Sequence, residues 1–126
     1  MTLCNHLILD GHAQIFKRRQ GQADLVHQLL SRLVNLVGMT ELDNPYVATF
    51  SPWNYPHEHW GNTGIVAIVP LAESHISLHT WWDTGAFWFD LLSCKPFNAR
   101  KVENWLAHEY EVVVAKRWAL KRQMGE

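Results

Sequence analysis

The sequence has little of several features that define whole classes of protein. It contains two cysteines in 126 residues, too few for the disulfide framework of a small secreted domain. We find no apolar run that resembles a signal peptide or a membrane span. The formal net charge is only -1, which provides no long-range field toward nucleic acid or anionic lipid. We therefore expect a cytoplasmic protein that binds neither nucleic acid nor membranes.

The composition is that of one globular domain. Hydrophobic residues make up 48% of the chain and charged residues 18%, a balance that supports a packed core. The length suits a single domain, so we assign residues 1–126 to one unit. Seven tryptophans are many for this length. Large aromatic side chains suit a thick core, a subunit interface or a nucleobase site.

Hydrophobic periodicity predicts the α+β fold class. Helices are expected at 24–37, which ends at Gly38, and at 99–110, for which Asn98 is the expected N-cap. Hairpins join the middle strands, which indicates an antiparallel sheet. The expected strands are 3–10, 46–50, 64–69, 75–82, 86–93 and 111–115.

Two helices can cover only one face of this sheet. The prediction is a two-layer sandwich with both helices on one face of the antiparallel sheet. The other face is apolar enough to need a partner, and a second copy of the chain is the simplest one. We therefore expect a homodimer that forms through the sheet.

Residues 51–64 form a loop that is rich in stacking groups. Backbone breakers make the loop costly to order, and loops of this kind commonly carry function. Its aromatic and imidazole side chains include Trp53, Tyr55, His57 and Trp60.

The most informative stretch is 72–81, which contains Ser74 and His79, followed by Cys94 fifteen positions after His79. By residue type alone, each of these has an ordinary structural explanation. If residues 83–85 form a three-residue hairpin loop, the pairing places Ser74 opposite Cys94, with Cβ atoms about 5 Å apart. A hydroxyl and a thiol would then share one site.

His79 does not fit into that site within a single chain. Five residues of extended strand separate it from Ser74 by about 16 Å, at about 3.3 Å per residue. His79 is therefore either structural or acts on the Ser74 of a second subunit.

Two segments, Glu73 to Trp81 and Phe89 to Cys94, resemble the bacterial S-adenosylmethionine decarboxylases. The similarity is dense from Thr63 to Cys94. It implies a proenzyme that cleaves itself between Glu73 and Ser74 into a beta chain, 1–73, and an alpha chain, 74–126. Ser74 then becomes a pyruvoyl group, the cofactor of the enzyme.

The resemblance also implies roles for the other residues. His79 would assist the elimination that forms the pyruvoyl group, Thr63 would assist processing, and Cys94 would return a proton to the substrate carbon. The family forms homodimers in which each active site contains residues of both chains. In such a dimer, His79 of one chain would act on Ser74 of the other, so the long separation within one chain would not matter.

The implied substrate is S-adenosylmethionine, whose amine forms a Schiff base with the pyruvoyl group before CO₂ leaves. The product is the aminopropyl donor for spermidine synthesis. Asp83 stands where the family has the glutamate that binds the ribose hydroxyls, and Trp82 replaces a proline. His57 and Trp60 are candidates for substrate binding, as aromatic loop residues near the place of the adenine.

Two other interpretations remain open, and the geometry disfavours a third. The chain could decarboxylate a small amino acid, ornithine or arginine, with the same chemistry, or it could be a non-catalytic partner of an active paralogue. A metal protein is the third, suggested by His57 and His59. The pair His75 and His79 lies about 13 Å apart on a strand, too far for one zinc ion with ligands at about 2.1 Å, so we expect no metal.

Overall fold

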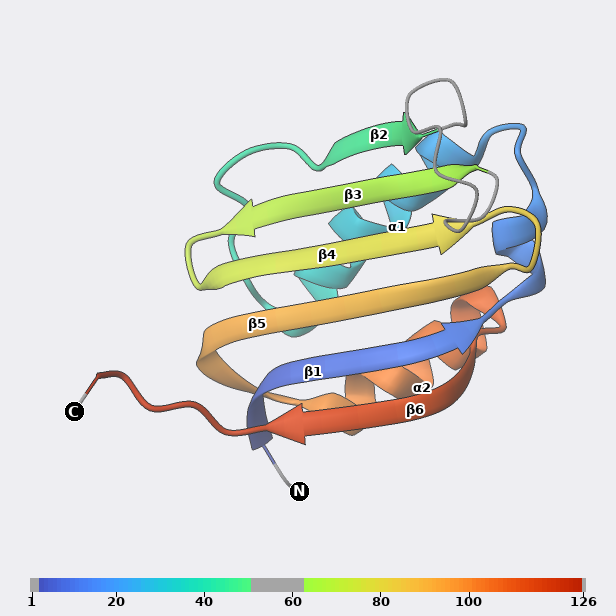
Figure 1. Ribbon diagram of the computed structural model, residues 1–126. Helices are drawn as coiled ribbons and strands as arrows, with labels where there is room; N and C mark the ends of the chain where they lie inside the picture. The colour runs from blue at the N-terminus through green and yellow to red at the C-terminus, as the bar shows by residue number, and fades with distance from the viewer. Residues whose placement is uncertain (1–2, 51–62, 126) are drawn as a thin grey trace.

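The computed structural model describes residues 3–50 and 63–125 (Figure 1). The described strands form one antiparallel sheet in the order β2-β3-β4-β5-β1-β6. The elements in chain order are β1 (Leu3–His12), the 3-10 helix η1 (Gln14–Lys17), α1 (Gln22–Val37), β2 (Tyr46–Phe50), β3 (Gly64–Leu71), β4 (Ser74–Trp81), β5 (Ala86–Asn98), α2 (Ala99–Tyr110) and β6 (Val113–Leu120).

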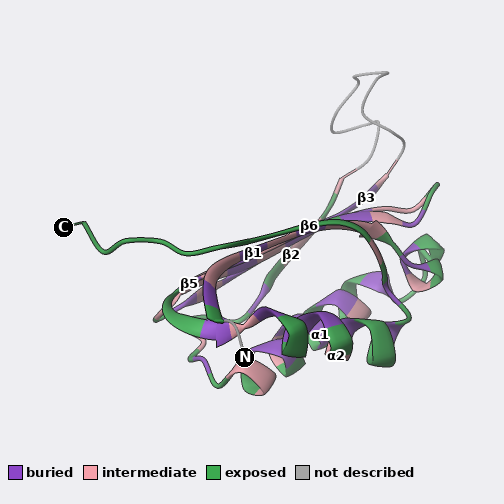
Figure 2. Cartoon of the chain, turned by 90° about the horizontal axis from the view of Figure 1, so that it is seen from below, coloured by how far each residue is buried: buried purple, intermediate pink, exposed green. Residues whose placement is uncertain are grey.

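Both long helices pack on the same face of the sheet, as the view from below shows (Figure 2). The core lies between the two layers, because alternate strand residues such as Leu7, Ile76 and Phe89 are fully buried against Leu30 and Val102 of the helices. The predicted α+β class with two helices on one face is confirmed.

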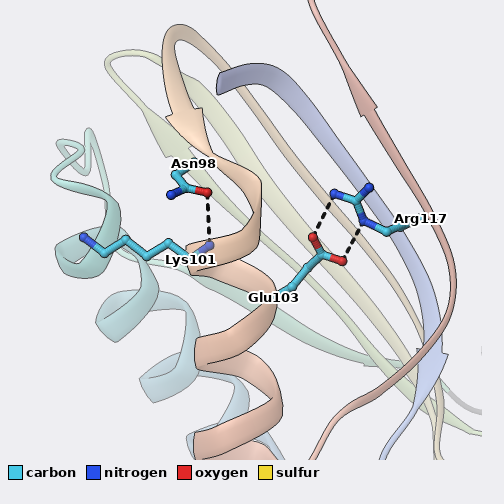
Figure 3. A network of polar contacts seen from close by, with 4 residues as sticks. All are labelled: Asn98, Lys101, Glu103 and Arg117. Carbon is cyan, nitrogen blue, oxygen red and sulfur yellow. Dashed lines mark hydrogen bonds and ion pairs between the residues drawn. The ribbon is translucent and has the colours of Figure 1, made fainter. Parts of the chain in front are cut away.

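Capping residues mark the end of α1 and the start of α2. Gly38 takes a left-handed φ of +67° at the end of α1, and its N–H donates to Asn35 O at 3.2 Å. At the start of α2 the Asn98 side chain accepts from the Lys101 N–H at 3.3 Å (Figure 3).

A bidentate salt bridge joins α2 to the sheet. The Arg117 guanidinium of β6 donates to both carboxylate oxygens of Glu103, at 2.8 and 2.9 Å (Figure 3). Glu103 is almost fully buried, so this bidentate contact supplies the hydrogen bonds that its carboxylate needs away from water.

The hairpin between β4 and β5 differs from the prediction by one residue. The Gly85 N–H donates to Trp81 O at 2.9 Å, which makes the loop four residues long, 82–85, instead of three. The register therefore pairs Ser74 with Ser93, and the expected pairing of Ser74 with Cys94 is wrong by one position.

The last strand also differs, because it begins later and runs further than 111–115. Glu111 takes a left-handed φ of +54° where α2 ends, so it cannot start a strand. β6 then pairs along β1 from His12↔Val113 to His6↔Leu120. The short helix η1 was not predicted.

The face of the sheet away from the helices is exposed and carries large apolar side chains. Those on β3 and β5 alternate with buried positions, and those on β6 pair with Ile8 and His6 of β1. The set comes from both halves of the sheet and consists of Val66, Ile68, Trp88, Trp118 and Leu120. We call this surface the open face. Among residues 3–50 and 63–125, no helix is long and apolar enough to cross a membrane.

Candidate active site

The turn between β3 and β4 places a strained serine after Glu73. Leu71 pairs with Ser74, so the turn itself is only Ala72 and Glu73. Such tight hairpins usually place a residue with positive φ in the turn, commonly glycine. Here the positive φ, +157°, falls on Ser74 instead. Ser74 thus holds an unfavourable backbone angle beside the peptide bond that the resemblance marks for cleavage.

The segment after α1 holds this turn in place. The Thr40 N–H donates to a Glu73 carboxylate oxygen at 3.0 Å, and the Ala72 N–H donates to Thr40 O at 2.9 Å. Two residues further along the segment, the Leu42 N–H donates to Pro70 O at 3.0 Å. The Glu73 side chain is therefore occupied in anchoring the turn.

The carbonyl of Glu73 accepts a hydrogen bond from the Cys94 N–H at 2.9 Å. This carbonyl carbon is the atom that Ser74 Oγ would attack. An amide donor aimed at its oxygen withdraws electron density and stabilises the negative charge that attack creates. Cys94, on the neighbouring strand, therefore reaches the expected cleavage site through its backbone.

A bulge in β5 makes that hydrogen bond available. β1 pairs through Cys4↔Phe97 and then His6↔Leu92, so residues 93–96 stand opposite the single residue Asn5. The Asn5 side-chain amide donates to Ser93 O at 3.0 Å and bridges the gap. Cys94 is an exposed free thiol inside the bulge.

His79 lies toward the far end of β4 in a cluster of rings on the open face. Its ring stacks on Trp81 with centroids 3.9 Å apart and meets Phe50 edge to face at 4.9 Å. Burial lowers the pKa of His79 below its ordinary value of 6.5. Within the described residues, His79 Nε2 is buried and has no hydrogen-bond partner. A neutral ring of this kind can accept a proton from a group outside this chain.

Thr63 lies three residues beyond His79 along the sheet, because Val66 is the residue paired with His79. Its carbonyl accepts from the Trp82 N–H at 2.9 Å. Its buried Oγ1 has no hydrogen-bond partner in the described part of the chain. The β3–β4 hairpin thus holds Thr63 and His79 at one end and Ser74 at the other.

The substrate-binding candidates are only partly visible. Asp83 is exposed in the β4–β5 turn, where one carboxylate oxygen accepts from the Thr84 N–H at 3.0 Å. His57 and Trp60 lie outside the described residues. Over the ranges 3–50 and 63–125, no group of three His, Cys, Asp or Glu side chains could hold a metal ion.

The sequence analysis did not assign a role to two residues whose side chains make contacts at the site, Asn5 and His75. Ser74 Oγ lies 3.4 Å from Nδ1 of His75, the next residue. His75 was visible in the sequence as the residue after the expected nucleophile, whereas Asn5 has no sequence signal because it acts across 88 positions.

The fold and the site together define a class: an α+β protein that presents a serine beside a polarised peptide carbonyl in a hairpin turn. The sequence profile described as S-adenosylmethionine decarboxylase matches residues 5–123. The chain therefore belongs to the S-adenosylmethionine decarboxylase family, whose members are self-processing proenzymes with a pyruvoyl cofactor.

Individual relatives agree with this assignment. A protein of Persephonella marina named S-adenosylmethionine decarboxylase proenzyme is 30% identical over 125 residues, which is 99% of this chain and 82% of that protein. A protein of the same name from Thermococcus kodakarensis is 30% identical over 107 residues, 84% of this chain and 67% of the relative. The family expected from residues Thr63 to Cys94 is confirmed.

Proposed function

We propose that this chain cleaves itself between Glu73 and Ser74, and that the processed enzyme decarboxylates S-adenosylmethionine. The observation that carries the proposal is the hydrogen bond from the Cys94 N–H to the Glu73 carbonyl, 2.9 Å long. Together with the strained φ of Ser74, it prepares one peptide bond of the chain for attack by its own hydroxyl.

Processing follows from these contacts. Ser74 Oγ bonds to the Glu73 carbonyl carbon, the C–N bond breaks, and the freed amine takes the hydroxyl proton, which leaves an ester. Loss of the Ser74 Cα proton then expels the Glu73 carboxylate, which becomes the end of the 1–73 chain. Water replaces the nitrogen of the remaining dehydroalanine, ammonia leaves, and 74–126 begins with the pyruvoyl ketone.

The site residues fit that cofactor. The pyruvoyl ketone supplies an electron sink when an α-amino acid loses CO₂. The exposed thiol of Cys94, the residue after the Ser93 that pairs with Ser74, would hold the proton that the substrate carbon receives. We assign ribose binding to Asp83 and adenine stacking to His57 and Trp60. A working thiol needs a reducing compartment, which supports the cytoplasmic location.

We further propose that the active enzyme is a homodimer joined through the open face. Large apolar side chains such as Trp88, 57% exposed, and Trp118, 42% exposed, form a surface that favours burial. His79 and Thr63 each hold a buried polar atom without a partner among the described residues. A two-fold related copy would bring these groups toward the other chain's Ser74, which their own chain keeps about 16 Å or more away.

One observation supports a second candidate substrate. The Asp83 carboxylate already accepts the Thr84 N–H, which leaves it less capacity for two ribose hydroxyls than an uncommitted carboxylate has. A pyruvoyl enzyme that decarboxylates ornithine or arginine needs no ribose contact.

The test is release of labelled CO₂ from the carboxyl group of S-adenosylmethionine, ornithine and arginine, each with purified Ser74→Ala protein as the blank. We expect release from S-adenosylmethionine alone. Release only from ornithine or arginine would transfer the assignment to the second candidate, and release from none of the three would refute both.

A further inference from the structure

The first step of processing lacks a base in the roles assigned above. Ser74 Oγ must lose its proton as it attacks, and His79 of the same chain lies about 16 Å away along β4. Among the described residues, the titratable side chain that contacts this hydroxyl is His75, whose Nδ1 is 3.4 Å from Ser74 Oγ.

We infer that His75 is the general base of this first step, an inference that rests on the proposed self-cleavage. His75 Nδ1 takes the Ser74 Oγ proton while Oγ bonds to the Glu73 carbonyl carbon. The same nitrogen then gives that proton to the Ser74 nitrogen as the C–N bond breaks. Atoms and charge balance within one chain, and no other reagent is needed.

The backbone explains how adjacent residues can cooperate. Neighbours on a regular strand point to opposite faces, so a serine and the next histidine normally do not meet. The φ of Ser74, +157°, departs from the strand value of about -140°, and the contact at 3.4 Å is the result. The hydroxyl thus contacts a base, and the carbonyl carbon that it would attack belongs to the preceding residue.

The surroundings leave the His75 ring free for this role. Its strand neighbours are Pro70 on β3 and Leu92 on β5, neither of which has a side chain that hydrogen-bonds. His6, the residue paired with Leu92 from β1, is engaged with Asp90 at 2.8 Å. Among the described residues, the Ser74 hydroxyl is the one hydrogen-bond partner of the His75 ring.

Two histidines then divide processing into two steps with different stalled products. Without His75 the peptide bond should stay an amide. Without His79 the chain should reach the ester and stop before elimination. Hydroxylamine separates these states, because it cleaves esters and leaves amides intact under mild conditions.

The experiment follows processing of newly synthesised protein by gel and mass spectrometry, with and without hydroxylamine. Four variants are compared with the wild type: His75→Ala, His75→Gln, His79→Ala, and His27→Ala as the control at an exposed position of α1. We expect both His75 variants to process about a hundredfold slower or worse, with no hydroxylamine-sensitive ester. Added imidazole should accelerate His75→Ala and leave His75→Gln unchanged, because only the smaller side chain leaves room for it.

Each other outcome is decisive. Processing of both His75 variants as fast as His27→Ala would overturn the role of His75 alone. An ester that accumulates in His75→Ala would move His75 to the second step. No recovery of His75→Ala with imidazole would reduce His75 to a structural residue. If wild type and His27→Ala stay intact, self-cleavage itself is wrong, and the role of His75 falls with it.

Discussion

Ser74 combines a positive φ, a neighbouring imidazole and a polarised carbonyl, and its Cα can become the ketone carbon only after its hydroxyl has formed the ester. We predict that Ser74→Ala abolishes both cleavage and decarboxylation. The free energy of unfolding should change by less than about 1 kcal/mol, because the hydroxyl makes one long hydrogen bond. Chemical denaturation of the uncleaved variant measures this, and residual CO₂ release above background would refute the pyruvoyl mechanism.

Cys94 contributes its backbone to one reaction and its side chain to the other. We predict that Cys94→Ala still cleaves, since alanine keeps the N–H that donates to the Glu73 carbonyl. Decarboxylation should fall by about 10²-fold or more, because the acid that protonates the substrate carbon is lost. Rates of cleavage and of CO₂ release on the same preparation test this split. Full turnover would make Cys94 a structural residue.

The buried ring of His79 should make stability depend on pH. Burial lowers the pKa of His79 in the folded chain below the ordinary value of 6.5, so the unfolded chain binds the proton more tightly. This contribution to stability is complete above pH 6.5 and is lost as the pH falls through the lower, folded value. We predict that His79→Gln loses less stability between pH 7 and pH 5 than the wild type does. The urea midpoints of both proteins, measured at pH 5, 6 and 7 and at fixed protein concentration, test this. An equal loss of stability with falling pH in the two proteins would contradict it.

At the scale of the elements, strong local signals predicted helices and strands well. The bounds of β2 and α2 agree with expectation, because an N-cap at Asn98 and a short apolar run are local features. The predicted start of β6 was too early because Glu111 takes a left-handed backbone angle after α2. Sequence patterns rarely indicate that angle at residues other than glycine and asparagine.

The contacts of the candidate site residues differ from those expected from the sequence. Ser74, Cys94 and Glu73 were identified from the sequence, and the structure brings Cys94 to Glu73. The expected contact was between side chains, whereas the observed one uses a backbone N–H. A one-residue change in loop length shifts the register of β5, and a bulge opposite Asn5 frees that N–H. Both effects depend on tertiary structure.

The β4–β5 turn depends on Gly85. Its φ is +75°, and a Cβ there would lie 2.5 Å from the backbone oxygen of Ala13. We predict that Gly85→Ala lowers the free energy of unfolding by more than about 1 kcal/mol. Gly125→Ala is the matched control, because Gly125 has a φ of +82° and open space around it. Equal unfolding midpoints for the two variants would show that the turn tolerates a side chain.

For the whole molecule, the open face and the position of His79 lead to the same dimer. If His79 acts across the interface, coexpression of Ser74→Ala and His79→Ala chains assembles one site that lacks both groups and one that lacks neither. We predict that the mixed dimer regains processing and activity, up to about half of wild type per dimer. Differently tagged chains, purified in tandem, provide the measurement, with each variant alone as the control.

Coexpression that restores nothing would contradict the shared site, because each site of the mixed dimer would then lack one essential group. The proposal that the chain cleaves itself before Ser74 would not be contradicted by that result. Separately purified variants are a poor substitute, since processing takes place in the folded proenzyme and a sheet interface can exchange slowly after assembly.

Intact-mass measurement tests the central claim, self-cleavage before Ser74, most directly. After incubation, wild-type protein should give two chains, 1–73 and 74–126, and the second should carry a pyruvoyl group and no free α-amine. Ser74→Ala, measured beside it, should remain one chain. A single unmodified wild-type chain of 14.6 kDa after prolonged incubation would contradict the account.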